Sequence, residues 1–214
     1  MNQLANLQKL ETASFFDKTT LQQVVKVSDN SLYSNIKRWI EKGDLIQLKK
    51  GLYVTSAYYQ RLANKQDYLE FVANNLKYPS YLSLEYVLQK YSILSESVFS
   101  LTSISRKKTK VYSNKLGVFS YSSIKDDLFT GFSVVDKSGF KIRQASKAKA
   151  LFDYFYFKSR SIPKFDKDLL ASFRLNLDEF SKADFTELDS YIKLAGSSNL
   201  RDITKLLKQI KNDS

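Results

Sequence analysis

The chain contains no cysteine and no histidine among its 214 residues. Without cysteine it can form no disulfide and offers no thiolate nucleophile, and without histidine it lacks the side chain that most often exchanges protons near neutral pH. The zinc sites that proteins build from these two residue types are excluded as well. Enzyme chemistry would therefore depend on carboxylates, lysine or tyrosine, and the absence of cysteine suits the reducing cytoplasm in which we expect the protein to work.

Glycine is also scarce, since the six glycines stand singly at positions 43, 51, 117, 131, 139 and 196. Neither a dinucleotide-binding GxGxxG motif nor a phosphate-binding P-loop can be built from them. Two close carboxylate pairs, Asp126 with Asp127 and Asp166 with Asp168, lie in turn-prone or helix-start surroundings that favour solvated or capping roles. We therefore expect a protein that is not an enzyme and that uses no cofactor and no metal.

Long hydrophobic runs are missing too, because no stretch approaches the roughly 18 to 20 apolar residues of a membrane-spanning helix. The first residues, MNQLANLQKLETASFF, lack the charged start and continuous apolar segment of a secretory signal. Acidic residues are outnumbered, with 34 lysines and arginines against 22 aspartates and glutamates, which gives a net charge of +12. Such an excess attracts polyanions, so we expect a nucleic-acid partner and no membrane.

The most informative segment, residues 15–55, has the spacing of a winged helix-turn-helix. A short helix with an apolar face is followed by Ser28, which is a good N-terminal cap for a second helix that begins at Asp29. Gly43 supplies the left-handed conformation that commonly ends a helix. The apolar face of this second helix comprises Leu32, Ile36, Trp39 and Ile40. Because these positions share one face, we expect them in a core, Trp39 included.

The opposite face of the second helix carries hydrogen-bonding groups near its N-terminus and cations further along. These side chains are Asn30, Ser31, Tyr33, Ser34, Lys37 and Arg38. Such a helix fits the major groove of duplex DNA, where polar side chains reach base edges and cations meet phosphates. The next two β-prone runs predict a hairpin whose tip places Lys49 and Lys50 against the DNA backbone. Helix-turn-helix geometry also occurs in protein-interaction modules, so the pattern alone leaves that alternative open.

We predict an α+β protein with a winged helix-turn-helix DNA-binding domain at residues 1–62 and a mixed domain at residues 63–214. The second domain begins with helical patterns at 67–76 and 84–91. It then changes to five β-prone runs between residues 97 and 144 and ends in several helices. Asparagine, serine and glycine residues separate the β-prone runs, so we expect an antiparallel sheet with the connectivity of a meander.

A second basic surface is predicted in this domain, because two of its stretches contain cations and no acidic residue. Its residues are Arg106, Lys107, Lys108, Lys110, Lys141, Arg143, Lys147 and Lys149. The aromatic residues between them, Tyr112, Phe119 and Tyr121, could stack on exposed bases, but alternation along a strand favours core positions. DNA beside the hairpin, an RNA and an acidic protein all suit the cationic surface, and the sequence does not choose among them.

Two further segments, PSYLSLEYVL at 79–88 and ASKAKALFDYF at 145–155, together with the basic hairpin EKGDLIQLKKGLYV, are similar to those of a known family. Residues 15–158 resemble the AbiEi antitoxin family of bacterial type IV toxin–antitoxin and abortive-infection systems. The positions that match the family motifs are Ser83, Leu88, Ala145, Ala150, Leu151 and Asp153. Ala148 stands where the family commonly has glutamate, a departure at a position with no assigned role.

The resemblance implies an N-terminal winged helix that represses its own operon by binding inverted repeats in the double-stranded promoter DNA. It also implies a C-terminal antitoxin domain that opposes a nucleotidyltransferase-like toxin encoded nearby, with no stable complex required.

Two alternative functions stay open. One is a ligand-responsive winged-helix regulator without a toxin partner, which would need a pocket with a few polar groups. The other is an enzyme acting on nucleic acid, which the missing histidine and scattered aspartates disfavour.

Overall fold

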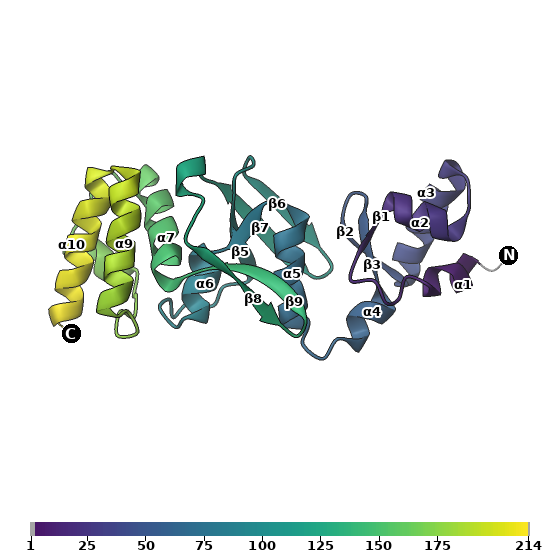
Figure 1. Ribbon diagram of the computed structural model, residues 1–214, viewed down its shortest axis with the longest axis horizontal. Coiled ribbons are helices and arrows are strands. Elements are labelled where there is room, and N and C mark those ends of the chain that lie inside the picture. Colours follow the sequence, from purple (N-terminus) through teal and green to yellow (C-terminus); the bar gives the residue numbers. More distant parts are fainter. Residues whose placement is uncertain (1–2, 214) are drawn as a thin grey trace.

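Helices dominate the two ends of the protein, whose computed structural model describes residues 3–213. In Figure 1 the molecule is elongated, with the N-terminal elements at one end, a large sheet in the middle and the last two helices at the other end. The helices, with one 3-10 turn, are α1 (Gln3–Gln8), α2 (Lys18–Val25), α3 (Asp29–Lys42), α4 (Ser56–Arg61), α5 (Lys65–Leu76), α6 (Leu84–Lys90), η1 (Asp126–Leu128), α7 (Lys147–Ser161), α8 (Lys167–Ser172), α9 (Lys182–Ala195) and α10 (Ser198–Asp213). Across residues 3–213, none of them has both the length and the apolar composition needed to cross a membrane.

The strands form two sheets, and together with the helices they confirm the predicted α+β class. They are β1 (Phe16–Asp17), β2 (Leu45–Lys49), β3 (Leu52–Thr55), β4 (Ser80–Leu82), β5 (Ser100–Ser105), β6 (Lys110–Asn114), β7 (Gly117–Ser123), β8 (Phe132–Lys137) and β9 (Phe140–Ala145). The smaller sheet has the order β1-β3-β2 and the larger one the order β6-β7-β5-β4-β9-β8. The five β-prone runs of the sequence correspond to β5 through β9.

The N-terminal elements enclose a hydrophobic core of their own. Ser28 caps α3 by accepting a hydrogen bond from the backbone N–H of Ser31 at 3.4 Å, and Gly43 ends the helix with a φ of 81°. Both caps are as predicted, and Trp39 is only 2% exposed, which confirms its core position. The other buried residues of this core are Leu7, Leu10, Phe16, Leu21, Val25, Leu32, Ile36, Leu45 and Tyr53. Burying each large apolar side chain contributes roughly 1.5–3 kcal/mol.

The larger sheet is not the meander that the sequence predicts. Strand β5 pairs in parallel with β7 instead of antiparallel with its chain neighbour β6, and β4 pairs in parallel with β9. The remaining pairings, β4 with β5, β6 with β7 and β8 with β9, are antiparallel. Strand β4 lies in the middle of this sheet but was not predicted, because all three of its residues are buried and so show no alternation.

Helices cover both faces of the larger sheet. Tyr121 of β7 donates its hydroxyl to the carbonyl of Ala73 at 2.6 Å, which places α5 on one face. On the other face the N–H of Tyr86 donates to Thr102 of β5 at 3.1 Å, and α7 packs against α6. Helix α7 is in turn flanked by α9 and α10, which form the far end of the molecule in Figure 1. Phe119, like Tyr121, is buried, so the core interpretation of the strand aromatics is confirmed for both.

The hairpin of β2 and β3 packs against the larger sheet. Ile46, Leu48 and Val54 of the hairpin belong to the hydrophobic core of residues 63–214, while Leu45 and Tyr53 belong to the N-terminal core. Asn114, at the end of β6, donates its amide Nδ2 to the carbonyl of Leu48 at 2.8 Å. The two predicted domains therefore share an interface built by the hairpin, and the hairpin does not extend freely into solvent.

Candidate nucleic-acid interface

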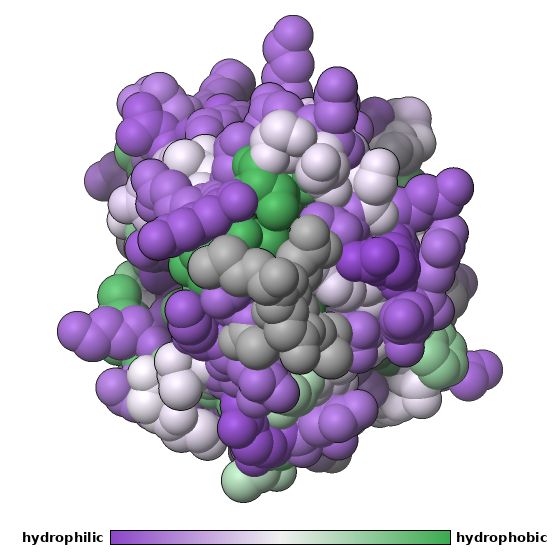
Figure 2. All heavy atoms as spheres, turned by 90° about the vertical axis from the view of Figure 1, so that its right-hand side faces the viewer, coloured by the Kyte–Doolittle hydropathy of each residue, from purple (hydrophilic) through white to green (hydrophobic). Residues whose placement is uncertain are grey.

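Helix α3 presents a polar face to solvent and buries the opposite one. All six predicted side chains on the polar face are exposed, whereas Leu32, Ile36 and Trp39 on the other face are buried. The exposed residues are Asn30, Ser31, Tyr33, Ser34, Lys37 and Arg38. Figure 2, which views the molecule from its N-terminal end, shows mostly hydrophilic side chains on this side. The amphipathic pattern of the sequence thus places these six groups together on one accessible helix face.

Lys18 adds a cation beside the start of α3 that the sequence reasoning missed. Its Nζ lies 4.1 Å from the centroid of the Tyr33 ring and 3.4 Å from the carboxylate of Asp29. A hydrogen bond with Tyr33 and the nearby Asp29 charge raise the pKa of Lys18, so it stays protonated. Lys18 is the first residue of α2, and only the packing of α2 against α3 brings it to this face.

Asn35 is a second residue of the interface that the sequence did not indicate. Although it lies on α3, it is only 6% exposed, and its Oδ1 accepts a hydrogen bond from Nη2 of Arg38 at 2.8 Å. A buried partner limits the orientations that the guanidinium can adopt. Through this hydrogen bond Asn35 orients Arg38 on the exposed face. A side chain that is already restrained loses less conformational entropy when it binds a ligand.

Lys49 does not project freely from the hairpin tip as the sequence predicts, and its contact with DNA phosphate stays a prediction. Its Nζ donates to the carbonyl of Leu76 at 2.6 Å, and its side chain is half-buried. Burial lowers the pKa of Lys49, and the neighbouring cations Lys107 and Lys77 lower it further. The carbonyl lies at the C-terminal end of α5, where the helix dipole favours a cation. Lys50, next in the turn, is exposed, and its phosphate contact stays a prediction.

The cations at the junction of the two domains form a cluster that we call the junction cluster. It consists of Lys49 from the hairpin, Lys77 from the end of α5, Lys107 from the segment between β5 and β6, and Lys110 from the start of β6. Burial lowers the pKa of Lys77, and the charges of Lys107 and Lys110 lower it further. Like charges held this close repel one another, so an anion placed among them would be stabilised.

Lys149 lies in the protein core, which corrects its assignment to the second basic surface. Its side chain is 0% exposed, and Nζ donates to Oδ1 of Asp153 at 2.7 Å and to the carbonyl of Leu128 at 2.9 Å. The two charged residues are four positions apart on α7, and this spacing puts them on the same face of the helix. That face packs inward, a fact that a count of charges along the sequence cannot reveal.

Among the other cations of the predicted second surface, two form ion pairs with acidic side chains. Arg106 donates twice to the Asp126 carboxylate, at 2.7 and 3.0 Å, and Lys147 lies 3.1 Å from that of Asp184. Arg106 is itself exposed, as are Lys107, Lys108, Lys110 and Lys141. Arg143 is half-buried, with its guanidinium 4.7 Å from the centroid of the exposed Tyr78 ring. The prediction of a second basic surface is therefore wrong for Lys149, and for the other seven residues it stays a prediction. Of these seven, Lys107 and Lys110 also belong to the junction cluster.

The two segments that carry the family resemblance meet in a buried hydrogen-bond network. Asp153 of α7 accepts from the hydroxyl of Ser83 at 2.7 Å and from that of Tyr81 at 3.0 Å, in addition to its contact with Lys149. Ser83 precedes α6, but its hydroxyl bonds to Asp153 and does not cap the helix. All four side chains are buried, so the network fixes β4 against α7 and offers no atom to a substrate.

The close carboxylate pairs have the structural surroundings that the sequence predicts. Asp166 caps α8 by accepting from the N–H of Leu169 at 2.8 Å, and Asp126 pairs with Arg106. Within the part of the chain that the structure describes, no three potential metal-binding side chains come together. The exposed face of α3 and the junction cluster are two surfaces of the described residues that gather cations and could bind a polyanion.

Comparison with known proteins does not assign a function to these two surfaces. No model of a known protein family matches the chain, and a search of curated protein sequences gives no match. The resemblance to the AbiEi antitoxin family therefore stays a prediction.

Proposed function

We propose that the protein is a repressor of its own promoter that also serves as the antitoxin of a type IV toxin–antitoxin system. In this proposal the N-terminal elements act as a winged helix-turn-helix and bind inverted repeats in duplex DNA. The observation that carries the DNA part is the exposed face of α3, on which an amide, hydroxyls and cations are gathered while Leu32, Ile36 and Trp39 are buried on the other face. Such a helix has the groups that major-groove recognition requires.

The order of groups along α3 indicates how the helix would read DNA. Asn30, Ser31 and Ser34 lie in its first two turns, where a recognition helix contacts base edges through amides and hydroxyls. Lys37 and Arg38 follow one turn later and would meet phosphates. Lys18, fixed beside Tyr33, adds a cation at the N-terminal end of the helix. The polar contacts would give sequence preference, and the cations would supply salt-dependent affinity.

The docked hairpin gives the second domain a part in DNA binding. A free wing would bring only its own lysines to the phosphate backbone, whereas this hairpin is held against α5 and β6. The hairpin therefore connects the junction cluster to α3, and in this proposal the DNA would run along both. Neutralising phosphates on one side of a duplex favours bending toward that side, so we propose that the bound promoter is bent.

The antitoxin part of the proposal concerns residues 63–214 and rests on the family resemblance. In it, this domain opposes a nucleotidyltransferase-like toxin in the cytoplasm without a stable complex. We expect that expressing the chain from a foreign promoter restores growth to cells that express the toxin-like product of the adjacent reading frame. Measured growth rates would check this. If the chain represses its promoter but leaves growth arrested, the protein is a winged-helix regulator without a toxin partner, and the antitoxin proposal is wrong.

A further inference from the structure

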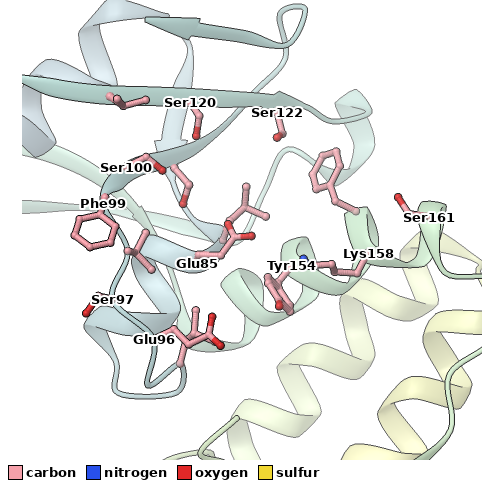
Figure 3. A pocket seen from close by; sticks show the side chains of 16 residues that line it. Glu85, Glu96, Ser97, Phe99, Ser100, Ser120, Ser122, Tyr154, Lys158 and Ser161 are labelled. Carbon is pink, nitrogen blue, oxygen red and sulfur yellow. The ribbon is translucent and has the colours of Figure 1, made fainter. Parts of the chain in front are cut away.

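A groove of about 710 Å³ opens between the larger sheet and α7. Its floor is formed by β5 and β7, its walls by α6, α7 and the segment 94–99 that leads into β5 (Figure 3). The volume falls within the roughly 300–1,000 Å³ of typical ligand sites. The groove lies on the sheet face opposite α5, so it is separate from the junction cluster and from α3.

The charge of this groove is opposite to that of the protein as a whole. It is lined by two carboxylates, Glu85 and Glu96, and by a single cation, Lys158. The Nζ of Lys158 is directed to the ring of Tyr154, 5.1 Å from its centroid. Burial, together with the two carboxylates, raises the pKa of Tyr154 to about 12, which places both negative charges near that ring. In a chain of net charge +12, this is a local negative site.

Polar and aromatic groups complete the lining. Ser120 and Ser122 of β7 lie on one strand face, and Figure 3 shows them, with Glu85, directed toward the same space. Phe99 stands at the rim and is 92% exposed, a high value for a large apolar side chain. Hydroxyls on a sheet floor can bond to a peptide backbone, and an exposed ring can stack on a guanidinium or cover an alkyl chain.

We propose that the groove binds a short basic segment of a partner protein. An arginine or lysine of that segment would lie between Glu85 and Glu96, and its neighbouring side chains would cover Phe99. The choice of a cationic partner follows from charge complementarity, because two carboxylates repel the phosphates of a nucleic acid. This inference goes beyond the proposed function and does not depend on DNA binding or on antitoxin activity.

Fluorescence anisotropy of the full chain with labelled synthetic peptides tests the proposal. The peptides alternate leucine with arginine, glutamine or glutamate. Non-specific attraction to a chain of charge +12 would make the glutamate peptide bind most tightly and the arginine peptide least tightly. Binding in the groove predicts the opposite order of affinities. We expect the arginine peptide to bind more tightly than the glutamine peptide. An arginine peptide that binds no better than the glutamine peptide would overturn the proposal.

Substitutions of the groove residues test whether the arginine peptide binds in the groove. We expect Glu85→Gln with Glu96→Gln to weaken the arginine peptide about 5- to 10-fold, the effect of two partly exposed ion pairs, and Phe99→Ala to weaken it about 2- to 5-fold. Asp178→Asn with Glu179→Gln, which removes the same charge from an exposed loop, is the matched control and should leave binding unchanged. Equal effects of the two double variants would mean that peptide affinity depends on the net charge of the protein and not on the groove, and would contradict the proposal.

Discussion

Replacing Lys37 and Arg38 by glutamate is expected to abolish repression of the promoter. Both side chains are exposed on the polar face of α3, and reversing their charges would set two carboxylates against phosphates. Two phosphate contacts would be lost and replaced by repulsion, so binding should weaken on the order of 100-fold or more and the salt dependence should become shallower. Reporter expression from the native promoter and DNA affinity measured at several salt concentrations would check this.

A matched control separates the position of these charges from their number. Lys193→Glu with Arg201→Glu changes the net charge equally, but these residues are exposed on α9 and α10 at the opposite end of the molecule (Figure 1). Repression should survive in this control. Growth rescue should survive in both variants, because neither one touches the core of residues 63–214. If the α3 variant represses as well as the control does, α3 is not the DNA-reading element.

Replacing Lys149 by methionine is expected to have the largest effect on stability. The change leaves the Asp153 carboxylate fully buried, with only the Ser83 and Tyr81 hydroxyls to bond it. Breaking a buried ion pair by removing one partner typically costs about 3–5 kcal/mol, a large share of the stability of a domain. Urea unfolding monitored by circular dichroism would measure the loss of unfolding free energy.

Two further variants show whether the loss of unfolding free energy arises from the Asp153 carboxylate that is left buried without its cation. Adding Asp153→Asn to Lys149→Met should recover part of the stability, since the amide can still bond to the hydroxyls without a buried charge. Lys147→Met on the same helix removes a cation whose ion pair is partly exposed, and it should cost at most about 1 kcal/mol. Equal losses from Lys147→Met and Lys149→Met would mean that the buried pair contributes nothing special.

Local signals in the sequence predicted the elements of the fold well. Ser28 and Gly43 mark the ends of α3 because capping is set by a few neighbouring residues. Alternation and turn residues located β5 through β9. The amphipathic pattern of α3 also identified which side chains are exposed, because helical periodicity alone divides its faces.

Features that depend on distant parts of the chain were not predictable in this way. The parallel pairing of β5 with β7 places β6 at the sheet edge, and no turn residue encodes that choice. Lys49 is drawn to the carbonyl of Leu76 only because the hairpin docks on α5. Lys149 is buried because Asp153 lies one turn away and the core closes over both. Charge density along the sequence could not distinguish these two lysines from exposed ones.

Footprinting of the DNA upstream of the coding sequence with the full chain tests the central claim most directly. At physiological ionic strength the account predicts protection of inverted repeats in that region, at protein concentrations that leave a random duplex of equal length unprotected. Protection should weaken steeply as salt is raised, because cations of α3 and of the junction cluster would each release counterions. Equal protection of the upstream region and of random DNA would contradict the account, since the face of α3 would then read no sequence.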